Sequence, residues 1–302
     1  MNNGSYRDFH PLGKVVMFFI LCLAGLVLFS LLSLGLVVLL GEEIDSLLSL
    51  RIQTLGGQIG AFLIPALVFV KLYGLSSVKG FLMNPPKTSH VLATLVLATV
   101  AMAFIGYLGE LNVKALEGKG GIIEFFRELE DQAADTIEIM LNMETIPALL
   151  INVFLIAVVP AVCEELAFRG VLQSQLAQAF QNTHLAIWIS AFIFSAIHFQ
   201  FFGFLPRLVL GAIFGYLMVY SGSIWPAITA HFINNALGVL GYYLAQNTDL
   251  LTQEQVESGE VEWYLALASL ILVLAIVAYI KRSSNWPGIE PHYLSVERAQ
   301  PS

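Results

Sequence analysis

The sequence predicts an all-α protein, a polytopic bundle of about eight transmembrane helices. Of its 302 residues, 57% are hydrophobic and only 12% are charged, and the mean hydropathy is +0.78. A soluble domain carries about 25% charged residues, whereas an apolar run of about 20 residues is long enough to cross a bilayer. The chain is therefore expected to be a multi-pass integral membrane protein, with the cell (inner) membrane as its expected location.

The net charge and the two cysteines argue against a nucleic-acid-binding protein and against a disulfide-stabilised one. The net charge of -8 argues against nucleic acid as a partner. Cys22 and Cys163 both lie in apolar stretches, so no disulfide framework is expected. The first apolar run, residues 15–40, is too long for the apolar part of a signal peptide, and we interpret it as a retained span.

Apolar stretches that can cross a hydrocarbon core of ~30 Å recur along the chain. The connections around the sixth stretch are short, which predicts that the fifth to seventh are antiparallel neighbours. The predicted spans are residues 15–40, 55–73, 89–109, 146–168, 185–203, 206–222, 224–246 and 262–280.

The distribution of charge predicts the orientation. Segment 110–144 has nine acidic and three basic residues, and segment 249–262 has five acidic residues and no basic one. Lysine and arginine gather at the opposite span ends, and such ends face the cytoplasm. Both termini are therefore expected to be cytoplasmic. The basic residues concerned are Arg7, Lys14, Lys71, Lys79, Lys87, Lys281, Arg282 and Arg298.

Three parts follow from this organisation. Residues 1–145 would hold the N-terminal spans and an outer amphipathic segment, residues 146–246 a catalytic helical core, and residues 247–302 the last span and a cytoplasmic tail. Within segment 110–145, apolar residues recur at helical spacing. Its apolar face is expected to lie on the outer membrane surface or over the mouth of the bundle, and a substrate gate is the alternative.

Two adjacent carboxylates and an arginine interrupt the fourth apolar stretch. One ionised side chain at the bilayer centre costs roughly 2.5–3.5 kcal/mol, so such a cluster requires a reason. On a helix, Glu165 and Arg169 share a face and can pair, whereas Glu164 points about 100° away toward another helix. Glu164 is thus the candidate general base and Glu165 with Arg169 the candidate brace. A purely structural ion pair at the membrane interface is the alternative.

Two histidines and an asparagine form the other polar clusters. His198 is the one ionisable group of the predicted span 185–203, and imidazole titrates near neutrality, as water activation requires. His231 and Asn235 are four residues apart, hence on one face of the predicted span 224–246. If these spans pack together, the three clusters converge. Counting residues from the span ends places Glu164 and His231 at similar depths and His198 about 10 Å nearer the outer face.

At these residues the chain resembles the CPBP family of intramembrane proteases, which includes type II CAAX prenyl endopeptidases, bacteriocin-processing proteins and Abi proteins. Glu164-Glu165-x-x-x-Arg169 is similar to the EExxxR element of the family, Phe194-x-x-x-His198 to its FxxxH element and His231-x-x-x-Asn235 to its HxxxN element. The three occur in the family's order within residues 162–238.

The resemblance implies an endopeptidase that cleaves a membrane-embedded peptide or protein. Glu164 and His198 would activate water, His231 and Asn235 would stabilise the oxyanion, and Glu165 and Arg169 would brace the helix. If the enzyme depends on a metal, Glu164, His198 and His231 would hold Zn²⁺ or another divalent cation. The zinc-binding HExxH run is absent, and a glutamate mechanism without metal stays open.

Two other functions use the same residues. Intramembrane Glu and His could relay protons in a transporter or channel, although the chain shows no repeated halves. A non-catalytic membrane scaffold of the same fold is the third reading, against which the intact polar residues argue. The sequence does not identify the substrate, so a prenylated terminus and a leader peptide both stay open. It does not identify the oligomeric state either.

Overall fold

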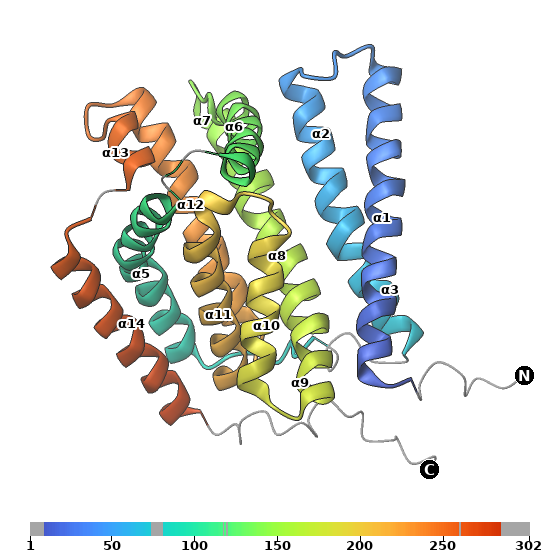
Figure 1. Ribbon diagram of the computed structural model, residues 1–302, viewed down its shortest axis with the longest axis vertical. Coiled ribbons are helices and arrows are strands. Elements are labelled where there is room, and N and C mark those ends of the chain that lie inside the picture. Colours follow the sequence, from blue (N-terminus) through green and yellow to red (C-terminus); the bar gives the residue numbers. More distant parts are fainter. Residues whose placement is uncertain (1–8, 74–80, 117, 119, 260, 285–302) are drawn as a thin grey trace, which may run out of the picture.

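The computed structural model describes residues 9–73, 81–116, 118, 120–259 and 261–284. Within these ranges the chain is helical and contains no strand, which confirms the all-α prediction. Long helices run side by side, and an N-terminal hairpin lies along one flank of the bundle (Figure 1).

The hairpin consists of α1 (Pro11–Leu40) and a second continuous helix made of α2 (Leu47–Gln58), the π-helical η1 (Ile59–Leu63) and α3 (Ile64–Leu72). The predicted start at residue 55 is wrong, because the helix begins eight residues earlier, where Ser46 caps it by accepting from the Ser49 N–H. The prediction missed this start because Arg51 and Gln53 lower the local hydropathy. In the helix, Arg51 is hydrogen-bonded to Asn152 and Gln53 to Ser49.

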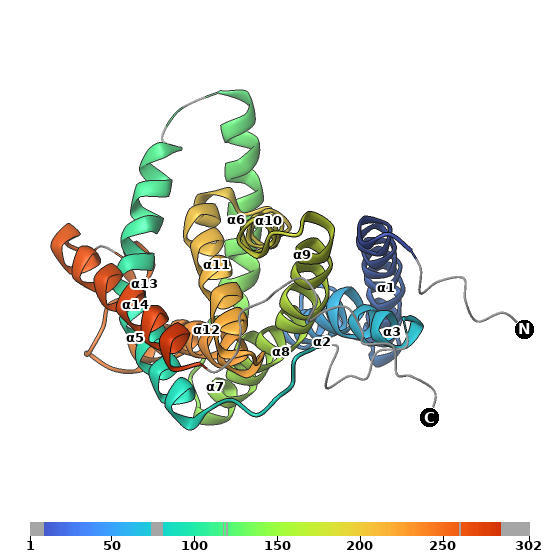
Figure 2. The ribbon, with the colours of Figure 1, turned by 90° about the horizontal axis from the view of Figure 1, so that it is seen from below.

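Two further long helices, α5 (Thr88–Ala115) and α14 (Trp263–Ser283), pack against each other on the opposite flank. The amphipathic α6 (Gly121–Leu141) follows α5, as the helical spacing of segment 110–145 predicts. Figures 1 and 2 together show that α6 lies across one end of the bundle. A short helix that the sequence did not predict, α13 (Gln253–Ser258), lies before α14.

The fourth predicted span is the centre of the molecule. It forms one continuous helical rod from α7 (Ile146–Asn152) and α8 (Val159–Glu165) to α9 (Ser174–Phe180), joined by the π-helical η2 (Val153–Val158) and η3 (Leu166–Gln173). The predicted end at residue 168 is wrong. Polar residues after that point resemble a span end in sequence, yet all eight residues of η3 are buried by neighbouring helices.

The next three helices are α10 (Thr183–Ala196), α11 (Phe204–Ser221) and α12 (Trp225–Asn247), with the short 3₁₀ turn η4 (Phe201–Gly203) before α11. Consecutive members of this group pack on each other, as the short connections predict. The helix α10 ends at Ala196, so the predicted span 185–203 is too long.

Within the described residues, six helical segments are long and apolar enough to cross a membrane, which supports an integral membrane protein. The segment α10 is apolar but shorter, and α12 does not meet the same criterion, so the count of eight spans stays a prediction. The start of α1 and the end of α14 lie on the same side of the bundle (Figure 1). The cytoplasmic assignment stays a prediction, and Arg7, Lys79 and Arg298 lie outside the described residues.

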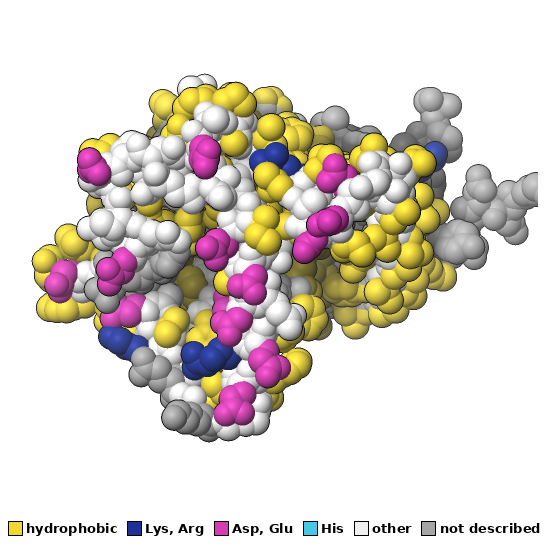
Figure 3. Space-filling model, turned by 90° about the horizontal axis from the view of Figure 1, so that it is seen from above, with side chains coloured by type: hydrophobic (Ala, Val, Ile, Leu, Met, Phe, Trp, Pro, Cys, Tyr) yellow, Lys and Arg dark blue, Asp and Glu magenta, His cyan; other side chains and the backbone are white. Residues whose placement is uncertain are grey.

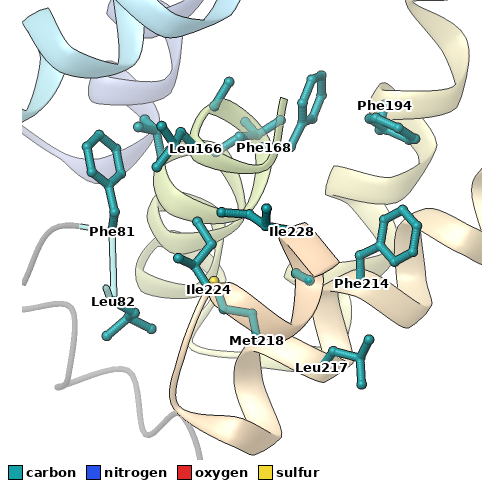
Figure 4. Packing of buried hydrophobic residues seen from close by; sticks show 14 of the residues in the cluster. Phe81, Leu82, Leu166, Phe168, Phe194, Phe214, Leu217, Met218, Ile224 and Ile228 are labelled. Carbon is teal, nitrogen blue, oxygen red and sulfur yellow. The ribbon is translucent and has the colours of Figure 1, made fainter. Parts of the chain in front are cut away.

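The face that carries α6 is rich in acidic side chains (Figure 3). The main hydrophobic core lies below it, where residues of η3 meet α10, α11 and α12. Figure 4 shows part of this core, with Phe168 and Leu166 on η3, Phe194 on α10 and Phe214 on α11. The polar residues that the sequence singles out are embedded in this apolar packing.

Candidate active site

Glu165 and Arg169 form a fully buried ion pair. The Arg169 Nη1 donates to Glu165 Oε1 at 2.8 Å, and the two side chains are 1% and 0% exposed. This is the pairing that four-residue spacing predicts. The guanidinium also lies 4.7 Å from the ring centroid of Phe194 and 5.4 Å from that of Phe214, in cation–π contact with both.

A glycine ladder on α11 completes the surroundings of this pair. Arg169 Nη2 donates to the Gly211 carbonyl at 2.9 Å, and Gln173 Nε2 donates to the Gly215 carbonyl at 3.4 Å. A Cβ on Gly215 would lie 2.6 Å from Gln173 Oε1. Glycines four residues apart let helices approach closely, so their carbonyls can accept from side chains of η3.

His231 is oriented by the same carboxylate. Its Nδ1 lies 2.9 Å from Glu165 Oε1, and its ring stacks on Phe214 with the centroids 5.2 Å apart. A carboxylate paired with Arg169 can only accept, so Nδ1 carries the hydrogen. Nε2 then faces Glu164, whose Oε2 is 3.8 Å away. Glu165 thus braces both its own helix and the histidine of α12.

The Glu164 side chain points away from that of Glu165, as helical geometry predicts. It is 5% exposed, and its Oε1 accepts from Gln58 Nε2 at 2.8 Å. Its contacts are thus with Gln58 and His231, while Glu165 takes the arginine. The similar depth predicted for Glu164 and His231 agrees with their 3.8 Å separation.

His198 lies just past the C-terminal end of α10, so the prediction that it belongs to the helix of span 185–203 is wrong. It belongs to the turn between α10 and η4, where Phe199 has a φ of 55°. Its Nδ1 lies 2.7 Å from the Phe194 carbonyl and donates to it, which leaves Nε2 free for chemistry.

The Phe194 ring links these side chains. Its centroid is 5.1 Å from that of His198 and 6.0 Å from that of His231, and it also packs edge-on against Phe168. The phenylalanine of the FxxxH pattern therefore contacts both histidines and Arg169 and fixes their relative position.

Asn235 is held by backbone rather than by the other polar side chains of the site. Its Nδ2 donates to the Ile156 carbonyl in η2 at 3.1 Å, and its Oδ1 accepts from Asn234 at 3.1 Å. One hydrogen of the Asn235 amide remains for another acceptor. Its role toward an oxyanion stays a prediction.

The predicted metal ligands do not form a ligand set. Among the described residues, no three His, Cys, Asp or Glu side chains are grouped so as to hold a metal ion. The side chains of Glu164, His198 and His231 are therefore not grouped as the Zn²⁺ site that the sequence suggests, and no chemical step is derived through a metal.

Gln58 is the site residue that sequence reasoning missed. It lies in the N-terminal hairpin, outside the predicted core of residues 146–246. A signal existed, because Gly56-Gly57-Gln58 places an amide in the middle of an apolar run. Each π-helical segment of the described chain also borders this site: η1 begins after Gln58, η2 contains Ile156 and η3 begins after Glu165. Such segments are frequent at functional sites.

Comparison with known proteins agrees with this geometry. Residues 146–237 match the family model described as type II CAAX prenyl endopeptidase Rce1-like. This match supports membership of the CPBP family. Rce1-like proteins are intramembrane proteases, so the family supports protease activity in a helical membrane protein.

One curated relative has a similar segment. The uncharacterized protein YpbD of Bacillus subtilis is 29% identical over 90 residues, which cover 28% of this chain and 43% of YpbD. The chain thus matches less than half of the length of that relative. No solved structure matches significantly.

Proposed function

We propose that this CPBP chain is an intramembrane endopeptidase in which Glu164 activates the water that attacks a peptide bond. The observation that supports the proposal best is that two adjacent acids, Glu164 and Glu165, have different hydrogen-bond partners. Glu165 is 0% exposed and is bonded through Oε1 to the charged Arg169 and to His231, whereas Glu164 is bonded through Oε1 to a neutral amide and has Oε2 3.8 Å from His231 Nε2.

The reaction follows from these groups. Water loses a proton to Glu164 as its oxygen forms a bond to the peptide carbonyl carbon, and the carbonyl oxygen takes up the electron pair. Glu164 then gives the proton to the leaving nitrogen as the carbon–nitrogen bond breaks. Because the bond to the Phe194 carbonyl is made by His198 Nδ1, His198 Nε2 can accept a hydrogen bond from the same water and orient it.

The oxyanion would be stabilised by His231 and Asn235. A neutral His231 with its hydrogen on Nδ1 cannot donate from Nε2, so donation to the oxyanion requires the imidazolium form. In that form Nδ1 would donate to Glu165 Oε1, which lies 2.9 Å away, and Nε2 would donate to the oxyanion. The remaining amide hydrogen of Asn235 would be the second donor.

The substrate is proposed to be a membrane-associated peptide or protein. A prenylated C-terminal peptide is the first to test, because the matching family model is described by CAAX prenyl endopeptidases. A leader or bacteriocin precursor is the second. Both bring a peptide bond to the bilayer, and the helical segments that carry Gln58 and Glu164 are long and apolar enough to cross it.

Cleavage in proteoliposomes tests the proposal. The purified chain is incubated in ¹⁸O-labelled water with a fluorogenic prenylated C-terminal peptide or a leader-type peptide. We expect products with one labelled carboxyl oxygen from the wild type and from Glu43→Gln, in which an exposed acid is changed. Glu164→Gln and His198→Ala should release none. Cleavage by Glu164→Gln at the wild-type rate would contradict the proposal, and proton flux without cleavage would favour a transporter.

A further inference from the structure

Gln58 reaches the site from α2 in the N-terminal hairpin, which carries none of the other residues assigned to the site. Its Nε2 donates to Glu164 Oε1 at 2.8 Å, across more than a hundred residues of sequence. Its own Oε1 is buried and has no hydrogen-bond partner among the described residues. An amide oxygen buried in this way is costly to leave unpaired, which indicates that it meets a donor during function.

The position of Gln58 is fixed by contacts on the other side of its helix. A Cβ on Gly56 would lie 1.9 Å from Ser33 Oγ, and one on Gly60 would lie 2.4 Å from Phe29 Cβ. These glycines therefore allow α2 and η1 to pack closely on α1. The opposite side of the helix, which carries Gln58, faces α8.

Two further contacts hold α2 without help from Gln58. Arg51 Nη2 donates to Asn152 Oδ1 at 3.3 Å, and Thr54 Oγ1 lies 3.6 Å from Met140 Sδ. Because the helix is anchored at these points, the bond between Gln58 and Glu164 is not required to hold the helix in place. The effect of that bond is therefore to orient the Glu164 carboxylate.

We propose that Gln58 is a further catalytic residue, which orients Glu164 through Nε2 and accepts a hydrogen bond from the attacking water through Oε1. One water hydrogen points to the Glu164 carboxylate, and the other is shared between His198 Nε2 and Gln58 Oε1 in a three-centre hydrogen bond, so that an oxygen lone pair is directed at the substrate carbonyl. No atom of Gln58 is transferred in the reaction. This inference rests on the proposed function and adds α2 to its catalytic machinery.

Kinetics of three variants test the inference, with the purified full chain and the peptide that the wild type cleaves best. Gln58→Met keeps the size of the side chain but removes both polar atoms. We expect its kcat to fall roughly 10- to 100-fold with KM unchanged. Gln58→Asn should recover part of the loss. Gln53→Met is the control, because Gln53 lies on the same helix and bonds only to Ser49 and the Ile44 carbonyl. Its kcat should match the wild type.

A second measurement does not depend on activity. In a background without Cys22 and Cys163, Gln58→Cys with Glu164→Cys should be joined by a short bis-thiosulfonate cross-linker, and Gln53→Cys with Glu164→Cys should not. Gln58→Met with wild-type kcat, a kcat loss equal to that of Gln53→Met, or no cross-link would each overturn the inference. Full cleavage by Glu164→Gln would instead overturn the proposed function, so the two failures are distinguishable.

Discussion

Glu165 accepts two hydrogen bonds at one oxygen, from Arg169 at 2.8 Å and from His231 at 2.9 Å, while its neighbour Glu164 bonds to Gln58. Adjacent residues on a helix point about 100° apart, which is enough to give identical side chains opposite surroundings. Glu165 is part of a buried charged network with Arg169, whereas Glu164 is bonded to a neutral amide and has its Oε2 3.8 Å from His231 Nε2.

The buried network predicts the effect of losing Arg169. Arg169→Ala leaves Glu165 as an uncompensated buried charge, and breaking such a pair costs about 3–5 kcal/mol. We expect this variant to yield much less folded protein than Glu164→Ala, measured by size-exclusion fluorescence of solubilised membranes. Arg169→Ala combined with Glu165→Ala should recover part of the loss. Equal abundance of Arg169→Ala and Glu164→Ala would count against the pairing.

The donor arrangement predicts the response to chelation. Because Glu164, His198 and His231 are not grouped as a ligand set, we expect the purified protein to keep its cleavage activity after dialysis against a chelator. Metal content by mass spectrometry is measured on the same sample. Loss of activity with chelator, together with recovery on adding back one equivalent of Zn²⁺, would show that the side chains rearrange around a metal.

At the scale of helices, the contact between η3 and α11 depends on glycine. Gly215→Ala would force a methyl group to 2.6 Å from Gln173 Oε1 and 2.9 Å from Ile187 Cγ2. Such overpacking costs about 1–3 kcal/mol. Gly238→Ala on α12 is the matched control, since no atom lies within 4 Å of the added group. We expect a lower thermal unfolding midpoint for Gly215→Ala only, and equal midpoints would contradict the packing described.

The helix α6 holds the turn that carries His198. Phe126 stacks on Phe201 with the centroids 4.0 Å apart, and Glu130 Oε2 accepts from the Phe202 N–H at 3.3 Å. Burial raises the pKa of the Glu130 carboxyl, while Arg207 and the Phe202 N–H oppose the rise. The folded state thus binds this proton more tightly than the unfolded state, so this contribution to stability is lost as the pH rises through the raised pKa.

Glu130→Gln removes this titration and keeps an acceptor for the Phe202 N–H. We expect the thermal midpoint of the wild type, relative to that of Glu130→Gln, to fall as the pH rises from about 4 to 7. Glu128→Gln, which changes an exposed acid on the same helix, is the control for the loss of one negative charge from α6. A relative midpoint that rises with pH would show that the attraction to Arg207 outweighs burial.

Helix ends were the least predictable features at this scale. Hydropathy placed the end of the central rod near Phe168, because it cannot distinguish polar residues that leave the membrane from polar residues that neighbours bury, such as Arg169 and Gln173. The end of α10 at Ala196 was missed for the opposite reason, since apolar residues continue into the turn at Ile197 and Phe199.

At the scale of the whole molecule, the sequence predicted an all-α membrane bundle because low charge and long apolar runs suffice for that conclusion. The pairing of Glu165 with Arg169 was predictable because both lie on one helix. Contacts between helices were not predictable. The sequence marks Gln58 as an amide in an apolar run, but nothing in it indicates that the partner is Glu164 on the central rod.

The central claim is that Glu164 activates water for peptide-bond cleavage inside the membrane. The most direct measurement compares peptide termini in the membrane proteomes of otherwise identical cells that produce the wild type, Glu164→Gln or Glu43→Gln at equal abundance. The account predicts a set of new termini in the wild type and Glu43→Gln that is absent with Glu164→Gln, while the uncleaved precursors accumulate. The same termini at the same abundance with Glu164→Gln would contradict it.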